Sequence, residues 1–134
     1  MIDVSLTADY TGSWAIVVGI NDYSDLSPLS GAVNDAKVIA QLFRKEFRFP
    51  EDHVFLILND DATQTAIREQ LEMLCQQTQR NDRVVFFFAG HGATRRTPSD
   101  TEIGYVATVE STPDQWHTFL KIDDITDYSK LNAT

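Results

Sequence analysis

One histidine of this chain stands where a catalytic group would be well placed. His91 lies between Gly90 and Gly92, directly after the apolar run 83–88. If that run is a buried parallel strand, the histidine follows its carboxyl end, where open α/β sheets bind their ligands. Imidazole titrates near neutral pH, and the glycines leave room for a substrate main chain. A loop histidine between turn glycines gives the same pattern, so position alone leaves both interpretations open.

A nucleophile to accompany this histidine is not evident. Cys75 is the only cysteine of the chain, and it falls within a segment of helical periodicity. Most cysteines in such a segment are half-buried packing residues, so we assign Cys75 no catalytic role. A single cysteine also excludes an internal disulfide, which favours a reducing, cytoplasmic location. The other two histidines, His53 and His117, have no partners at metal-ligand spacing, and we interpret both as surface residues.

Composition limits the class of protein and of partner. The 134 residues are 43% hydrophobic, enough for the core of one domain over 1–134, with 1–13 as an N-terminal extension or edge segment. With 11 basic and 20 acidic residues the net charge is −9, which argues against nucleic acid or an anionic membrane as the main partner. No apolar run approaches the roughly 18 residues of a membrane span, and the first residues lack a signal-peptide pattern.

Alternating strands and helices must position these residues. The apolar runs 14–20, 54–58 and 83–88 predict strands that are buried on both faces. Between them, 31–48 and the segment that follows Thr63 repeat apolar residues every three or four positions, which predicts amphipathic helices. This order predicts right-handed crossovers and a parallel sheet that is covered on both faces.

The pattern changes after the histidine. Residues 102–109 alternate between larger apolar residues and other types, which predicts a strand or one arm of a hairpin, and 122–131 are weakly helical. Arg95 and Arg96 stand in a segment rich in Thr, Pro and Ser. We interpret this segment as a loop with a solvated charge pair or, alternatively, as a cleavage site for an Arg-specific protease.

Five segments, in this order and spacing, resemble the caspase-like cysteine peptidases, and within them the metacaspase and bacterial caspase-homologue branch. The most specific are Gly31-Ala-Val-Asn-Asp-Ala36 and the apolar run that ends in Gly90-His-Gly92. The resemblance covers the chain from Trp14 to Leu131. It implies an α/β fold, a caspase-like three-layer sandwich with a mainly parallel central sheet, here incomplete at its C-terminal side. The five segments are 14–21, 29–36, 47–50, 61–63 and 82–92.

The resemblance gives the histidine and its neighbour roles in peptide-bond hydrolysis. His91 matches the catalytic histidine that manages the protons of a cysteine thiolate, and the backbone N–H of Gly92 matches a donor to the oxyanion. In caspases the cysteine follows the histidine by about 50 residues, which places it near position ~141, beyond Thr134. The resemblance therefore implies the large-subunit portion of a cysteine endopeptidase, inactive without a complementary C-terminal portion that carries the cysteine.

Substrate preference is implied by one acidic residue. Asp35 matches the position where metacaspases place a carboxylate that receives an Arg or Lys side chain of the substrate. A carboxylate pairs with a guanidinium through two hydrogen bonds, so Asp35 predicts a basic residue before the cleaved bond. Ala32 and Ala89 stand where metacaspases often carry Cys and Ser, so some polarity of that pocket is absent. An acid in the first turn of a helix is also favoured by the helix dipole alone.

A calcium site is a further implication of the resemblance. Asp123-Asp124 resembles the paired acids of calcium-dependent metacaspases, and Asp100 or Glu102 would supply a further oxygen. Hard oxygen ligands suit Ca²⁺, although the spacing is unlike that of an EF-hand. Paired acids at a helix N-terminus are the competing explanation. The peptidase chemistry itself requires no cofactor.

Two other functions stay open from the sequence. A catalytically dead caspase-fold module, which binds a partner or scaffolds an assembly, agrees with the missing nucleophile. A receiver-like signalling domain is disfavoured, because the third strand ends in Gly-His-Gly where a phospho-acceptor carboxylate is required. If the family's next strand is absent, the outer edge of 84–88 is bare, which predicts self-association, strand exchange or a complementary chain.

Overall fold

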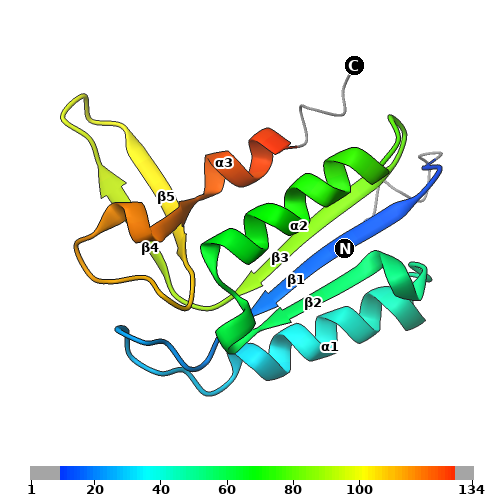
Figure 1. Cartoon of the computed structure of the whole chain (residues 1–134), viewed down its shortest axis with the longest axis horizontal. Coiled ribbons are helices and arrows are strands. Elements are labelled where there is room, and N and C mark those ends of the chain that lie inside the picture. The colour runs from blue at the N-terminus through cyan, green and yellow to red at the C-terminus, as the bar shows by residue number, and fades with distance from the viewer. Residues whose placement is uncertain (1–9, 129–134) are drawn as a thin grey trace.

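Three apolar segments form a parallel sheet in the computed structural model, which describes residues 10–128 (Figure 1). β1 (Ser13–Gly19) lies between β2 (Val54–Leu58) and β3 (Arg83–Ala89), and both ladders are parallel. The last five residues of β1 are all buried, as the continuous apolar run of this strand predicts. The three predicted strands and their parallel arrangement are confirmed.

Different helices cover the two faces of this sheet. α1 (Ala32–Lys45) packs on the face that carries Val17 of β1, whereas α2 (Gln64–Gln77) packs on the face that carries Val18. α3 (Ile122–Asp127) joins α2 on the second face. The arrangement is the three-layer α/β sandwich that the resemblance implies. The buried apolar residues of the helices are Ala32, Ala36 and Ala40 in α1, Ile67, Leu71 and Leu74 in α2, and Ile125 in α3.

Small residues bring α1 very close to the end of β1. A Cβ atom at Gly19 would lie 2.6 Å from the Cβ of Ala36 and 2.8 Å from the carbonyl oxygen of Ala32. Real Cβ atoms do not approach other atoms so closely, so position 19 requires glycine. This contact fixes where β1 stops and where the chain turns into the loop that precedes α1.

α1 ends at Lys45, three residues earlier than the apolar spacing predicts. Arg48 has a φ of 57°, a left-handed conformation through which a right-handed helix does not continue. After this turn Phe49 is buried and stacks on Phe43, with 4.9 Å between the ring centroids. Phe47 keeps the four-residue spacing from Phe43 although it lies beyond the end of the helix, and this explains the error.

A small antiparallel sheet follows the histidine (Figure 1). It consists of β4 (Gly92–Arg96), β5 (Glu102–Ala107) and β6 (Phe119–Lys121), with β5 in the middle. β5 confirms the predicted hairpin strand. The loop predicted around Arg95 and Arg96 is wrong, since both residues belong to β4. An exposed, polar edge strand carries no apolar alternation that the sequence could show.

Three one-turn 3₁₀ helices complete the described structure: η2 (Glu51–His53), η3 (Asn59–Asp61) and η4 (Trp116–Thr118). Among residues 10–128, no helix is both long enough and apolar enough to cross a membrane. α3 corresponds to the first part of the helical pattern predicted at 122–131. The end of that pattern and most of the predicted N-terminal extension lie outside the described residues.

The outer edge of β3 has no strand beside it within the described part of the chain, because β3 pairs with β1 alone. Val84 lies on this strand with 43% of its surface exposed. A cavity of about 530 Å³ adjoins β3, α2 and α3. The apolar residues that line it are Leu71, Leu74, Val84, Phe86 and Ile125. The sheet order thus agrees with the bare edge that the sequence predicts.

Candidate active site

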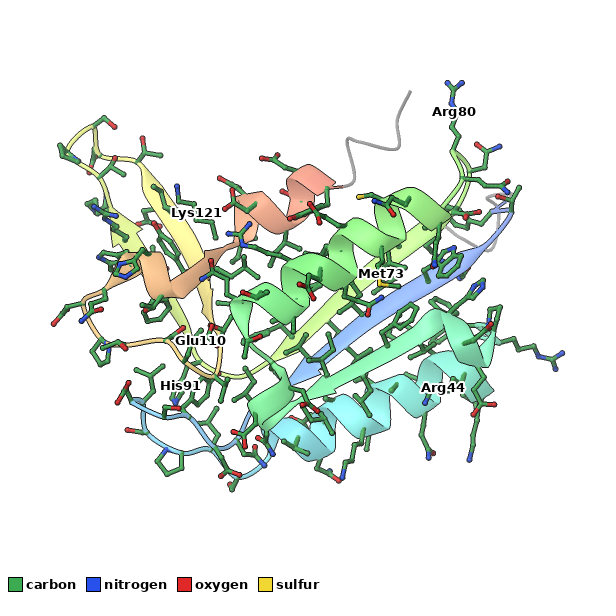
Figure 2. The ribbon with its side chains drawn as sticks, viewed as in Figure 1. Arg44, Met73, Arg80, His91, Glu110 and Lys121 are labelled. Atoms are coloured by element: carbon green, nitrogen blue, oxygen red, sulfur yellow. The ribbon has the colours of Figure 1, made fainter. Side chains whose placement is uncertain are left out.

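His91 lies at the turn from β3 into β4, at the carboxyl end of the parallel sheet (Figure 2). The preceding position requires glycine. A Cβ atom at Gly90 would lie 2.4 Å from the hydroxyl oxygen of Tyr23 and 2.9 Å from the ring of Phe88. The histidine therefore stands where the sequence predicts it, directly beyond the third strand of the sheet.

The imidazole of His91 is oriented by a backbone carbonyl. Its Nε2 lies 2.7 Å from the carbonyl oxygen of Ser27, in the loop between β1 and α1. A carbonyl oxygen only accepts, so Nε2 carries the hydrogen when this bond is made. In the neutral ring Nδ1 then keeps its lone pair and is the nitrogen that can take up a proton. The geometry suits a general base whose tautomer is fixed in advance.

Tyr23 holds the backbone of the histidine. Its hydroxyl accepts a hydrogen bond from the N–H of His91 at 2.8 Å and donates one to the carbonyl oxygen of Ala107 at 3.1 Å. The phenol and imidazole rings are tilted, with 4.9 Å between their centroids. Burial raises the pKa of Tyr23, and the hydrogen bond from His91 lowers it by a smaller amount. Tyr23 thus connects the loop before α1 to both sheets.

Sequence reasoning missed the contribution of this loop. Ser27 acts through its main chain, which no residue type signals. Tyr23 offered a clue, because an aromatic residue with a hydroxyl in a turn-rich segment often has a buried hydrogen-bond partner.

The backbone N–H of Gly92 points away from the strand next to it. Ala107 donates from its N–H to the carbonyl oxygen of His91 at 2.9 Å, so these two residues stand at a hydrogen-bonding position of the ladder. Hydrogen-bonded and non-hydrogen-bonded pairs alternate in an antiparallel ladder, and the next pair is Gly92 with Val106. The ladder therefore leaves the N–H of Gly92 directed outward. Its role as an oxyanion donor stays a prediction.

Side chains fix both ends of the loop that carries Tyr23 and Ser27. Asn21 Oδ1 accepts a hydrogen bond from the N–H of Ala32 at 2.9 Å and so caps the N-terminus of α1 from outside the helix. Asn59 Oδ1 accepts one from the N–H of Asn21 at 2.9 Å. These contacts connect the ends of β1 and β2 to the start of α1, and the histidine rests on the loop between them.

Comparison with known proteins identifies this architecture. A family model described as the caspase domain matches residues 13–132. The chain belongs to the caspase-domain family. Metacaspase-3 of Arabidopsis thaliana is 28% identical over 95 residues, which are 66% of this chain and 26% of that protein. Metacaspase-1 of Debaryomyces hansenii is 32% identical over 98 residues, which are 67% of this chain and 22% of that protein.

The fold of this caspase domain also occurs in a solved structure. The crystal structure of a protein from Geobacter sulfurreducens superimposes with a TM-score of 0.69 over 87% of this chain and 44% of that chain, at 16% sequence identity. This likeness concerns the fold alone. The matched part of this chain spans about a quarter of the length of the metacaspases named above.

Asp35 lies in the first turn of α1 in this caspase domain, and it is exposed. The helix begins where the loop that carries Ser27 ends. Ala32, at the start of the same helix, is buried, and Ala89 is the last residue of β3. These three positions occupy the carboxyl end of the parallel sheet, as the histidine does. Contact of Asp35 with a substrate stays a prediction.

The acids predicted to bind calcium are not gathered into one group. Asp123 and Asp124 form the first turn of α3, and Asp124 pairs with Arg68 at 3.3 Å. Asp100 lies in the turn between β4 and β5, where Arg96 binds it at 2.6 Å. No group of three or more His, Cys, Asp or Glu side chains within residues 10–128 is arranged to hold a metal ion. Binding of calcium by Asp123 and Asp124 stays a prediction.

Cys75 has the surroundings of a structural thiol. Its Sγ donates to the carbonyl oxygen of Tyr128 at 3.0 Å, which joins α2 to the end of α3. Burial raises the pKa of Cys75, and the negative charge of Glu72 raises it further. The thiol stays protonated near neutral pH, which agrees with the prediction that Cys75 is not a nucleophile.

The two remaining histidines differ from one another. His117 is exposed, as predicted. His53 is only partly exposed: its ring stacks on Trp14 at 3.5 Å between centroids, and its Nδ1 lies 3.1 Å from the carbonyl oxygen of Ser13. The surface position predicted for His53 is therefore wrong. The stacking partner is 39 positions away in sequence, so residue spacing could not show it.

Proposed function

We propose that this caspase domain is the histidine-bearing part of a cysteine endopeptidase, and that the nucleophilic thiol lies on the polypeptide beyond Thr134. The observation that supports this most strongly is the state of His91. Its Nε2 is hydrogen-bonded to the carbonyl oxygen of Ser27 at 2.7 Å, and its Nδ1 remains to accept a proton at the carboxyl end of the sheet. The family and the open edge of β3 support the same function.

In the proposed chemistry, His91 takes up and releases a proton in each of two stages, formation of the thioester and its hydrolysis. Nδ1 takes the proton of the thiol, the sulfur bonds to the substrate carbonyl carbon, and the carbonyl electrons move to the oxygen, which accepts from the N–H of Gly92. Collapse of this intermediate breaks the C–N bond, and the imidazolium gives its proton to the leaving amine. Water then attacks the thioester, loses a proton to Nδ1, and the thiol leaves with that proton.

The chain alone is proposed to be inactive, because the thiol of Cys75 is protonated and donates a hydrogen bond to the carbonyl oxygen of Tyr128. The test compares the 134-residue chain with a version extended through the next cysteine of its reading frame, on a fluorogenic peptide. Turnover is expected in the extended version only. His91→Ala should lower kcat about 100- to 10,000-fold, the usual contribution of general acid–base catalysis.

Cys75→Ser serves as the matched control in this assay, since serine keeps a hydrogen-bond donor toward Tyr128. Its activity in the extended version should equal that of the parent. Turnover that survives His91→Ala, or that is lost with Cys75→Ser while the protein stays folded, would contradict the proposal.

Preference for Arg or Lys before the cleaved bond is the second part of the proposal. It rests on Asp35, an exposed carboxylate at the carboxyl end of the sheet, in a chain of net charge −9. A charge-assisted hydrogen bond contributes about 1.5–3 kcal/mol, so Asp35→Asn should lower kcat/KM for an Arg substrate about 10- to 100-fold. Equal cleavage of matched Arg and Asp substrates would exclude this preference.

A non-catalytic interaction module is the second candidate function. The open edge of β3 and the adjoining cavity of about 530 Å³ favour it, because they offer a docking place that needs no catalysis. The reading frame beyond Thr134 separates the two candidates. A strand-like segment that ends in a cysteine supports the peptidase, whereas a stop codon or a substituted cysteine supports the module.

A further inference from the structure

A second hollow, of about 290 Å³, lies on the small sheet and the start of α2. Figure 2 shows His91 beside the loop that follows β1 and Lys121 near α3, apart from it. Arg95 of this hollow follows His91 by four residues, which is about 13 Å at the rise of a strand. The residues that line the hollow are Gln64, Arg68, Arg95, Tyr105, Trp116, His117, Phe119, Lys121 and Asp124.

The strand register places two cations on one face of the small sheet. Arg95 of β4 stands opposite Ile103 of β5, and Lys121 of β6 stands opposite Tyr105 of β5. Ile103 and Tyr105 are two positions apart, so they point to the same face. Arg95 and Lys121 therefore project from the two outer strands of that face, on either side of β5.

Aromatic rings form the floor between these cations. Trp116 packs on Tyr105 with 4.8 Å between ring centroids and on Phe119 with 5.6 Å. The guanidinium of Arg95 lies over the Trp116 ring at 5.7 Å from its centroid. Stacking on the ring positions the planar guanidinium before any ligand arrives.

The charge of the hollow is opposite to that of the whole protein. It contains three cations and one acid, while the chain carries a net charge of −9. The acid, Asp124, is paired with Arg68 at 3.3 Å. Within residues 10–128, neither Arg95 nor Lys121 has a salt-bridge partner. Two positive charges thus remain available for a ligand.

We propose that this hollow binds an extended acidic peptide, with a carboxylate between Arg95 and Lys121 and a neighbouring apolar side chain on Trp116. The negative charge of the whole protein disfavours a polyanion such as nucleic acid, whereas one or two carboxylates fit the two cations. The use of this hollow as a second contact for substrates rests on the proposed function. A peptide held at His91 would reach it within about four extended residues.

The test titrates the peptide acetyl-Glu-Leu-Glu-Leu-Glu-amide into the ¹⁵N-labelled chain. The readout is the indole N–H signal of Trp116, which should shift in a saturable way. A peptide with Gln in place of each Glu should bind at least tenfold more weakly. Arg95→Gln combined with Lys121→Gln should weaken binding of the acidic peptide at least tenfold.

Arg96→Gln is the matched control, because Arg96 is the next residue of β4, points to the other face and pairs with Asp100 and Glu102. It should bind the acidic peptide as the parent does. The indole N–H signal of Trp14, which donates to Asp82, reports whether each variant stays folded.

Equal binding of the Gln peptide, or an equal loss in Arg96→Gln, would overturn the proposal. Inorganic phosphate that shifts the Trp116 signal as strongly as the peptide would also overturn it, in favour of a phosphate site. The measurement involves no turnover, so its failure and a failure of the peptidase proposal are distinguishable.

Discussion

His91 is oriented by main-chain and phenol groups rather than by a carboxylate. The Ser27 carbonyl fixes the ring, and Tyr23 fixes the backbone behind it. Both groups come from the loop before α1, so the position of His91 depends on the position of this loop.

Tyr23→Phe tests this arrangement. The substitution leaves the N–H of His91 and the carbonyl oxygen of Ala107 without a partner, in a region where Tyr23 is only 9% exposed. We expect a loss of about 1–3 kcal/mol in the free energy of unfolding, measured by urea titration. Tyr10→Phe, at a residue that is 41% exposed, is the control and should change the free energy of unfolding little. Equal losses in the two variants would contradict the role given to Tyr23.

The thiol of Cys75 should react slowly with iodoacetamide at pH 7. Its pKa is raised by burial and by Glu72, so the thiolate fraction at neutral pH is smaller than in an unfolded peptide. Alkylation followed by mass spectrometry should accelerate only when the pH exceeds the ordinary thiol range. Labelling at pH 7 as fast as in urea would contradict a raised pKa of Cys75, and faster labelling would show an activated thiol.

The sequence predicted that His91 directly follows the third strand and that Cys75 lies half-buried in a helix. It could not predict Ser27 or the stacking of His53 on Trp14. The contact of Ser27 with His91 is a main-chain contact that any residue could make. The stacking of His53 on Trp14 depends on where two strands that are distant in sequence begin. Contacts of this kind follow from the path of the chain rather than from residue type.

At the scale of elements, Asp82 ties the start of β1 to the turn before β3. It accepts hydrogen bonds from the N–H of Gln79 at 2.9 Å, from the indole N–H of Trp14 at 3.1 Å and from the hydroxyl of Thr11. Burial alone would raise the pKa of Asp82, but these hydrogen bonds and the nearby His53 lower it below 3.8.

A lowered pKa makes the contribution of Asp82 dependent on pH. The stabilisation is complete above the unfolded value near 3.8 and is lost as the pH falls through the lower folded value. Asp82→Asn should therefore lower the melting temperature more at pH 7 than at pH 2.5. Asp52→Asn, at an exposed residue, is the control. If Asp82→Asn lowered the melting temperature equally at pH 7 and at pH 2.5, this assignment would be contradicted.

The elements of the main sheet were predictable, because buried parallel strands are continuous apolar runs and their helices have an apolar stripe. β4 and β6 were not. β4 is polar and exposed along most of its length, and β6 has three residues, so their pairing is imposed by β5. The end of α1 was misplaced because Phe47 keeps the four-residue spacing from Phe43 although it lies beyond Lys45, where the helix ends.

For the whole molecule, the open edge of β3 predicts association. Within residues 10–128 no strand pairs with this edge, so its backbone groups beside the exposed Val84 can pair with a strand from a second copy or from the continuing polypeptide. Light scattering of the 134-residue chain should show concentration-dependent self-association, and Val84→Lys should shift it toward the monomer.

Val38→Lys is the matched control, since Val38 is 57% exposed on α1, on the opposite face of the sheet. It should leave the association unchanged. A parent chain that stays monomeric at high concentration, or an equal effect of both lysines, would contradict association through β3.

In the proposed peptidase, His91 acts on a thiol that lies beyond Thr134. The most direct measurement treats the extended version with an arginyl acyloxymethyl ketone, which traps an activated thiol, and locates the adduct by mass spectrometry. We expect one adduct, on the added cysteine, formed at least about 100-fold more slowly in His91→Ala. An adduct on Cys75, or an unchanged rate in His91→Ala, would contradict it.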